Sequence, residues 1–220
     1  MIRDSLPRDG VFTTIKVVHG VPLFWEKHLE RLRKISLEEI LGYIAENRIT
    51  DAALRIDVLE NGEIQYAARS LPENNSLVRA VTVTPSSPLP TIKQRNRHIY
   101  EQADAFAKQN GANSALFSSN GFLLESTISN ILSIDENNNL VTPSLVSRGL
   151  KGITRQIFLD GKYIKEKDIF VLSSGPLILI NCLRVQGVTH LDGRILVDPR
   201  DLMERVQEII KKEEERFYTL

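Results

Sequence analysis

The sequence predicts an α+β fold with two lobes, because strand-like and helix-like patterns fall into two clusters along the chain. The first cluster covers residues 1–85 and the second covers 92–220, with the Pro-rich run "PSSPLP" between them. A chain of 220 residues is long enough for one large domain or two small ones. We therefore expect a small α+β lobe at 1–85 and a larger, β-rich α+β lobe at 92–220.

The composition narrows the class of protein. The formal net charge is zero, from 28 basic and 28 acidic residues, which argues against a broad nucleic-acid-binding surface. A single cysteine, Cys182, rules out an intrachain disulfide and fits a reducing cytoplasm. The N-terminus "MIRDSLPRDG" has no apolar signal core, and no apolar run reaches membrane-spanning length. We expect a cytoplasmic protein that binds neither nucleic acid nor membrane.

Turn and cap signals place the elements of the first lobe. Asn61-Gly62 separates two β-rich runs, which is a strong hairpin signal. Ser36 followed by Glu39 has the spacing of a capping box at the start of a helix. The expected elements are a hairpin, two helices, a second hairpin and a strand, over residues 11–25, 26–35, 36–48, 53–69 and 76–85.

The second lobe is expected to be richer in strands. Its predicted elements are an amphipathic helix, a strand, a short helix, a strand-rich region and a charged closing helix, over residues 97–111, 121–134, 152–161, 168–185 and 198–217. Residues 121–134, "GFLLESTISNILSI", read as a single apolar strand with Glu125 inside it. A carboxylate among such neighbours is costly to bury without a partner, although a strand-edge carboxylate facing water is an equally good interpretation.

Several weak signals could together carry chemistry. Lys93 opens the run "KQRNR", "KGITRQ" lies where a helix begins, and "LSSG" is a polar turn between apolar runs. Taken singly, these are a solvated lysine, a helix cap and an ordinary turn, and Arg31 is a solvated arginine on a charged helix. Together they supply what pyridoxal phosphate requires: an amine for its aldehyde, a carboxylate for its ring nitrogen and several phosphate contacts.

Four longer segments strengthen this interpretation. They are "DGVFTTIKVVHGVPLFWEKHLERL", "KQRNR", "SSNGFLLESTISNILSI" and "LVTPSLVSRGLKGITRQ", in this order over most of the chain. The sequence thereby resembles the fold-type IV pyridoxal-phosphate enzymes, the class IV aminotransferase family. The resemblance implies a D-amino-acid-aminotransferase-like fold with the cofactor site in the larger lobe. The chain is shorter than the family pattern at three points, so we expect a shortened fold with a phosphate helix of about two turns.

The resemblance also implies residue roles. It makes Lys93 the catalytic lysine, which forms a Schiff base with pyridoxal 5'-phosphate, and Glu125 the partner of the pyridine nitrogen. The cofactor's phosphate ligands that it implies are Arg31, Ile153, Thr154 and Ser174. The residues that it places on the substrate side are Thr14, Lys16 and Arg97. Lys16 could pair with a substrate carboxylate, and contact with solvent is equally compatible with the sequence.

The branch within the family is less sharply defined. Branched-chain transaminases usually carry Lys-x-x-x-Asn-Tyr, whereas this chain has Lys93-x-x-Asn96-Arg97, which is similar to aminodeoxychorismate lyase. Phe12-Thr13 also resembles the lyases, while "LKGITR" is similar to the D-amino-acid transaminases as well. Arg97 in place of tyrosine is the feature that separates the two branches.

The favoured function is therefore a 4-amino-4-deoxychorismate lyase, which releases 4-aminobenzoate and pyruvate for folate biosynthesis. The alternatives are a class IV aminotransferase acting on D- or branched-chain amino acids, and a reduced relative without catalysis. Retention of Lys93, Glu125, Arg31 and Thr154 together argues against the last of these. The resemblance further implies a small-molecule amino substrate and a homodimer.

Overall fold

The computed structural model describes residues 10–145 and 149–218, and their contacts divide the chain into two compact units. Unit 1 comprises the described residues up to Pro72 together with Ile92–Arg97. Unit 2 comprises Glu73–Thr91 and the described residues of His98–Tyr218. Within the described part of the chain, no helix combines the length and the apolar character needed to cross a membrane.

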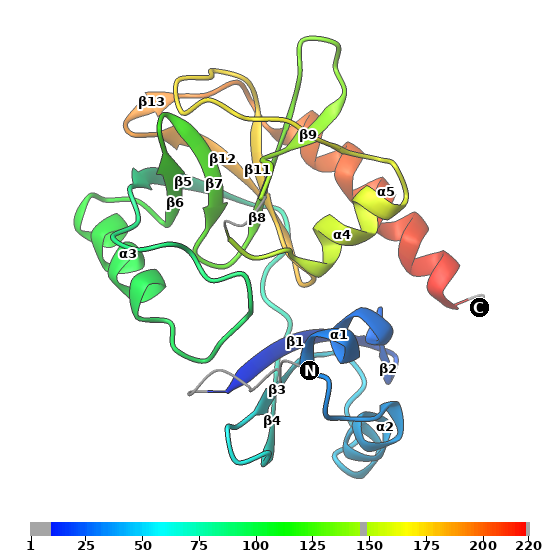
Figure 1. Ribbon diagram of the computed structural model, residues 1–220. Helices are drawn as coiled ribbons and strands as arrows, with labels where there is room; N and C mark the ends of the chain where they lie inside the picture. Colours follow the sequence, from blue (N-terminus) through cyan, green and yellow to red (C-terminus); the bar gives the residue numbers. More distant parts are fainter. Residues whose placement is uncertain (1–9, 146–148, 219–220) are drawn as a thin grey trace, which may run out of the picture. The chain divides into compact units, whose positions relative to one another are not determined.

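Unit 1 is an antiparallel sheet with two helices (Figure 1). Its strands, in the spatial order β2-β1-β3-β4, have the bounds Val21–Pro22, Val11–Val18, Ala52–Val58 and Ile64–Arg69. The helices are α1, Trp25–Leu32, and α2, Leu37–Glu46. Alternate residues of β1, including Ile15 and Val17, pack in one core with Leu32 of α1 and Ile40 of α2.

The local signals of unit 1 are confirmed. Both expected hairpins form, and α2 begins with the predicted capping box. The Glu39 backbone N–H donates to Ser36 Oγ at 3.2 Å, and the Ser36 N–H donates to the Glu39 carboxylate at 2.8 Å. These bonds satisfy two N–H groups that a helix start otherwise leaves without partners.

The described residues of unit 2 form nine strands. Their bounds are β5 Ser76–Val83, β6 Ser114–Ser119, β7 Phe122–Ser126, β8 Asn130–Ile134, β9 Leu140–Thr142, β10 Lys165–Glu166, β11 Leu177–Ile180, β12 Val185–Leu191 and β13 Arg194–Ile195. The spatial order is β10-β9-β8-β11-β12-β5-β6-β7, with β13 on β12. A further pairing of β7 with β8 closes six of these strands into a ring. Closure gives a barrel-like sheet with a filled interior, in which Leu116, Ile131 and Val188 are fully buried.

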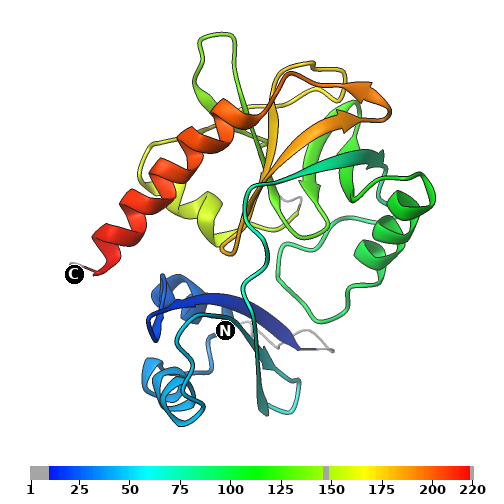
Figure 2. The same cartoon turned by 180° about the vertical axis from the view of Figure 1, so that it is seen from behind.

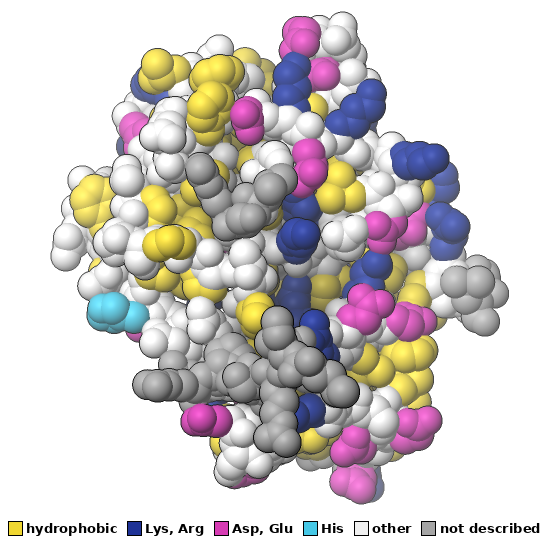
Figure 3. Space-filling view, viewed as in Figure 1, with side chains coloured by type: hydrophobic (Ala, Val, Ile, Leu, Met, Phe, Trp, Pro, Cys, Tyr) yellow, Lys and Arg dark blue, Asp and Glu magenta, His cyan; other side chains and the backbone are white. Residues whose placement is uncertain are grey.

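In the part of unit 2 that the structure describes, the helices beside this sheet are α3 His98–Gln109, α4 Ile153–Asp160 and α5 Arg200–Tyr218. In α3, Tyr100, Ala103 and Ala107 pack with Phe117 of β6. Figure 2 shows α5, in red, against the outside of β11 and β12. Acidic and basic side chains are mixed along α5 in Figure 3, as its charged amphipathic sequence predicts.

The expectation of one strand over 121–134 is wrong. The segment forms two antiparallel strands, β7 and β8, in which Glu125 pairs with Asn130. The turn between them is held by Ser126, whose Oγ accepts the N–H of Ser129 at 2.9 Å and that of Ile128 at 3.3 Å. Serine hydroxyls compete with strand ladders in this way, and the run "STIS" carried that signal.

The boundary between the units also differs from the expected one. The strand expected at 76–85 within the first lobe is β5, which pairs in parallel with β6 and β12 of unit 2. Residues 92–97, expected in the second lobe, belong to unit 1. Both differences arise from pairing between segments far apart in the chain, which local patterns do not report.

Candidate active site

The Lys93 segment is attached to β1. The Phe12 N–H donates to the Lys93 carbonyl at 2.9 Å, and the Arg95 N–H donates to the Gly10 carbonyl at 3.2 Å. An antiparallel bridge joins Val11 to Gln94 between these two bonds. The lysine therefore lies on a segment that the edge of the sheet fixes in register, within a tight turn in which the Gln94 N–H donates to the Ile92 carbonyl at 2.9 Å.

Three basic side chains surround the ring of Phe12, and we call these four residues the Phe12 cluster. Arg55 Cζ lies 3.9 Å from the ring centroid, Lys93 Nζ 5.0 Å and Arg97 Cζ 5.9 Å. Distances within about 6 Å permit cation–π attraction. Asp57 accepts two hydrogen bonds of 2.7 Å from Arg55. The cluster thus gathers three cations on one face of β1.

The other residues predicted in unit 1 lie close by. Thr14 and Lys16 alternate with buried residues of β1, so they lie on the same side of the strand as Phe12. Arg31 is in the last turn of α1. Its charge and that of Lys93 both act on His28, so the two predicted cofactor residues share this neighbour.

His28 is the buried base of unit 1. Its Nδ1 lies 2.7 Å from the Thr13 hydroxyl, and its Nε2 has no hydrogen-bond partner among the described residues. Burial, and then the charges of Arg31 and Lys93, lowers the pKa of His28 well below 6.5. The imidazole of His28 is therefore neutral at physiological pH, so it adds no third positive charge near Arg31 and Lys93.

In unit 2, Glu125 of β7 is 2% exposed and accepts hydrogen bonds on both of its oxygens. Tyr100 Oη donates to Oε1 at 3.0 Å, and the Leu150 backbone N–H donates to Oε2 at 2.7 Å. A phenol and a peptide N–H are thus among the proton-bearing partners of this carboxylate. Each carboxylate oxygen can accept more than one hydrogen bond, so this arrangement fits a further donor such as a protonated ring nitrogen.

The segment around Leu150 passes very close to the β7–β8 hairpin. Asn130 Nδ2 donates to the Leu150 carbonyl at 2.9 Å. A Cβ atom at Gly152 would lie 1.9 Å from Asn130 Oδ1, and one at Gly149 would lie 3.0 Å from the Glu125 carboxylate. Both glycines are therefore needed for the backbone to approach these two side chains.

Helix α4 starts directly after this segment. Its N-cap, Gly152, is extended and offers no side-chain cap, so the first N–H groups of the helix are left to another acceptor. Ile153 and Thr154 open the helix, which has eight residues, in line with the two turns expected. Such a start suits a phosphate group. Together with the buried carboxylate, it gives unit 2 a donor and acceptor set that fits pyridoxal phosphate.

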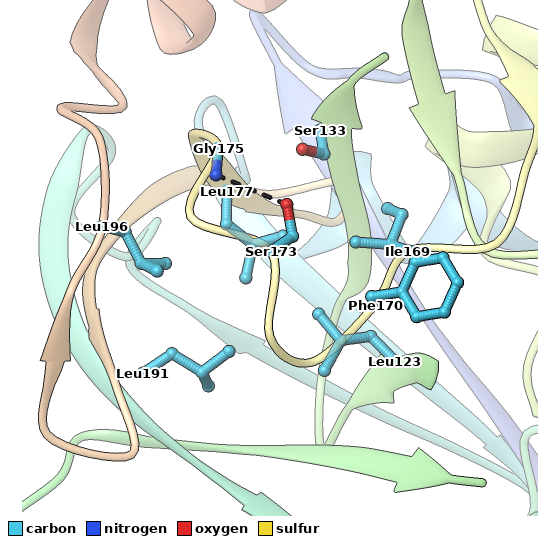
Figure 4. Close-up of a pocket in the computed structure, with 9 residues that line it drawn as sticks. All are labelled: Leu123, Ser133, Ile169, Phe170, Ser173, Gly175, Leu177, Leu191 and Leu196. Carbon is cyan, nitrogen blue, oxygen red and sulfur yellow. Dashed lines mark hydrogen bonds between the residues drawn. The ribbon is translucent and has the colours of Figure 1, made fainter. Parts of the chain in front are cut away.

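Ser174 lies elsewhere in unit 2. It is exposed, and its carbonyl accepts the Val197 N–H at 3.0 Å, beside β13. Its neighbours Ser173 and Gly175 line a cavity of about 10 Å³ together with Ser133 and apolar residues (Figure 4). That volume is about one water molecule, far below the size of a cofactor. The hydrogen bond from Val197 therefore places Ser174 beside β13 and does not bring it to the start of α4.

The predicted residues thus form two local groups. Lys93, Arg31, Arg97, Thr14 and Lys16 lie in unit 1, and the group in unit 2 consists of Glu125, Ile153 and Thr154. Sequence reasoning gave no role to Tyr100, Asn130 or the Leu150 peptide. Asn130 ends a Glu-x-x-x-x-Asn motif within the matched segment "SSNGFLLESTISNILSI", whereas Tyr100 looked like one apolar residue of an amphipathic helix.

Comparisons with known proteins identify the family of this chain. The sequence model of the family described as "Amino-transferase class IV" matches residues 45–171. A curated relative from Methanocaldococcus jannaschii, provisionally named a branched-chain-amino-acid aminotransferase, is 28% identical over an alignment of 256 positions, which covers 95% of this chain and 86% of the relative.

Solved structures confirm the predicted fold. A protein from Legionella pneumophila, provisionally named a 4-amino-4-deoxychorismate lyase, superposes with a TM-score of 0.80 at 20% identity over 97% of each chain. A hypothetical aminotransferase from Mycobacterium tuberculosis, solved with PLP bound, gives a TM-score of 0.76 at 20% identity over 97% of this chain and 93% of that one.

Proposed function

The chain belongs to the class IV aminotransferase family, whose enzymes depend on pyridoxal phosphate, and we propose that it is a 4-amino-4-deoxychorismate lyase. The products would be 4-aminobenzoate and pyruvate. The observation that carries this choice is the Phe12 cluster, where Arg55, Lys93 and Arg97 surround one aromatic ring.

The Phe12 cluster favours an anionic substrate with an unsaturated ring. Aminodeoxychorismate carries two carboxylates, one on its ring and one on its enolpyruvyl group, whereas a branched-chain amino acid carries one. Arginine binds carboxylates through paired N–H donors, and Arg97 takes the place of the tyrosine of branched-chain transaminases. Two arginines beside the proposed catalytic lysine therefore suit the lyase substrate better.

Each proposed catalytic residue has one task. When bound, pyridoxal phosphate withdraws electrons from the carbon that bears the substrate amine. Lys93 holds the cofactor through its amine and, once displaced by the substrate, moves the proton at that carbon. Glu125, which accepts hydrogen bonds from Tyr100 and from the Leu150 N–H, would hold the proton on the ring nitrogen.

The phosphate is assigned to the helix start and one arginine. Ile153 and Thr154 offer the uncapped N–H groups of α4 and a hydroxyl, and Arg31 offers a guanidinium. Ser174 is kept as a proposed phosphate ligand. We expect it to bind the phosphate more weakly than the others, because its side chain is exposed and its backbone is bonded to Val197. Thr14 and Lys16 are assigned to the substrate side of β1.

An aminotransferase acting on D- or branched-chain amino acids is the second candidate. The name of the Methanocaldococcus jannaschii relative and the run "LKGITR" favour it. A transaminase would use Lys93 in the same first proton transfer and return the proton to the cofactor. We propose a cytoplasmic homodimer with either activity, and folate biosynthesis as the pathway for the lyase.

The test begins with absorbance spectra of the purified protein with pyridoxal phosphate, before and after borohydride. A visible imine band is expected, which borohydride should remove while leaving the cofactor covalently attached to Lys93. The band should be absent from Lys93→Ala. Lys108→Ala, which changes an exposed lysine of α3, should keep the band. Loss of the difference between these two variants would overturn the assignment of Lys93.

The substrate is then decided by two assays on the same preparation. The lyase releases pyruvate from aminodeoxychorismate without a keto-acid acceptor. A transaminase instead converts 2-oxoglutarate to glutamate in the presence of an amino acid donor. Turnover in the second assay alone would replace the lyase proposal with the second candidate.

A further inference from the structure

Tyr100 is fixed in an apolar environment with its hydroxyl on Glu125. The side chain is in the first turn of α3 and is 5% exposed. Its ring meets Phe117 edge-on, with centroids 5.5 Å apart and an interplanar angle of 84°. An edge-on pair of buried rings leaves the phenol little freedom. The Oη–Oε1 distance of 3.0 Å is therefore set by the packing of α3 on β6.

Tyr100 and Leu150 reach different oxygens of Glu125. Tyr100 donates to Oε1 and the Leu150 N–H donates to Oε2, so the two bonds together orient the carboxylate. Hydrogen bonds to the charged form of a buried acid favour that form over the neutral one. Removal of the phenol would take a donor from Oε1 of a carboxylate that is 2% exposed.

We propose that Tyr100 is a positioning residue for the proposed reaction: its hydroxyl keeps Glu125 ionised and oriented toward the ring nitrogen of the cofactor. The role rests on the proposed function, because it concerns the same site. It is separate from the Lys-x-x-x-Asn-Tyr tyrosine of branched-chain transaminases, whose place Arg97 takes here. Tyr100 acts through Glu125 and has no direct part in the chemistry.

A matched control exists within the same unit. Tyr163 Oη donates to Glu213 Oε1 at 2.7 Å, and its ring meets Phe158 edge-on at 6.1 Å and 66°. Tyr100→Phe and Tyr163→Phe therefore each remove one phenol–carboxylate bond and keep an edge-on aromatic pair. Tyr163 and Glu213 are partly exposed whereas Tyr100 and Glu125 are buried, so Tyr163→Phe should cost less stability. The control therefore lies in the coupling to Glu125 and in cofactor affinity, which only Tyr100→Phe should change.

The first measurement uses the protein without cofactor. A double-mutant cycle of Tyr100→Phe and Glu125→Gln by urea unfolding should give a coupling of about tenfold in the unfolding equilibrium, or about 1.4 kcal/mol. Tyr163→Phe combined with Glu125→Gln should be additive. A coupling of less than about twofold for Tyr100 would overturn the proposal.

The second measurement titrates pyridoxal phosphate and follows its absorbance against pH. Tyr100→Phe should weaken cofactor affinity about tenfold and narrow the pH range in which the protonated-ring band persists. It should also lower kcat with the KM for substrate unchanged. Tyr163→Phe should match the wild type in all three.

The outcomes separate the two proposals. If the wild type forms no borohydride-reducible band, the proposed function fails, and the double-mutant cycle still decides whether Tyr100 holds Glu125. If the wild type binds the cofactor and Tyr100→Phe binds it with the same affinity and pH profile as the wild type, the role of Tyr100 is refuted and the proposed function stands.

Discussion

Gly149 offers the sharpest test of the backbone path beside Glu125. Its φ is +81°, and a Cβ atom there would lie 3.0 Å from both the carboxyl carbon and Oε2 of Glu125. Gly149→Ala therefore combines two penalties. One is the left-handed backbone conformation, and the other is displacement of the carboxylate that accepts the Leu150 N–H.

The magnitude follows from these two parts. A left-handed conformation costs an L-residue about 1–2 kcal/mol. Weakening a hydrogen bond to a charged, buried group costs about 1.5–3 kcal/mol. Together they predict that Gly149→Ala lowers the free energy of unfolding by about 2.5–5 kcal/mol, if the penalties add. Pyridoxal phosphate affinity should fall as well, because Glu125 is moved.

Gly193→Ala is the matched control, measured by urea unfolding and cofactor titration. Gly193 has φ +78°, and no atom lies within 4 Å of its added Cβ. Gly193→Ala should lower the free energy of unfolding only by the cost of the left-handed conformation, about 1–2 kcal/mol, and should leave cofactor affinity unchanged. If the two variants differ by less than about 0.5 kcal/mol, the close approach of Gly149 to Glu125 is refuted.

Three further predictions concern unit 1. Ser36→Ala should lower the free energy of unfolding by about 1 kcal/mol in urea titrations, because it removes the capping box of α2. The pKa of His28 is lowered well below 6.5, so the unfolded chain binds a proton that the folded chain refuses. Its stabilising contribution is present above pH 6.5 and is lost as the pH falls toward the lowered value, and His28→Gln should flatten this slope in unfolding measured between about pH 7 and pH 5. Arg97→Gln should raise the KM for aminodeoxychorismate about tenfold and leave the cofactor band unchanged, and an unchanged KM would contradict the assignment of the Phe12 cluster to the substrate.

The fold was predictable wherever the signal is local. Asn61-Gly62, the Ser36 cap and the amphipathic pattern of 97–111 each correspond to an element of the structure. The failures are non-local. The pairing of β5 with β6 and β12 depends on segments that periodicity treats separately, and the turn inside 121–134 depended on one serine hydroxyl.

The site could be predicted by residue type but not by contact. Lys93 and Glu125 were chosen because an amine and a buried carboxylate suit pyridoxal phosphate, and the structure adds what surrounds each of them. Arg55 was not chosen, because nothing in "LRIDV" indicates that its guanidinium lies 3.9 Å from the Phe12 ring. Such contacts arise from cross-strand geometry, since Thr14 pairs with Arg55 and Phe12 with Asp57.

The hairpin of β7 and β8 gives the Glu-x-x-x-x-Asn spacing a physical meaning. Four residues, 126–129, separate Glu125 from Asn130, and their turn makes the two residues opposite partners across two antiparallel strands, so both side chains leave the same face. Glu125 accepts the N–H of Leu150, and Asn130 donates to the carbonyl of the same residue. The backbone N–H and the carbonyl of Leu150 are thereby bound by Glu125 and Asn130, respectively. Because α4 starts at Ile153, three residues beyond Leu150, these two hydrogen bonds also position the start of the proposed phosphate-binding helix. One hairpin thus positions both the carboxylate and the start of α4, which gives a physical reason for the Glu-x-x-x-x-Asn spacing.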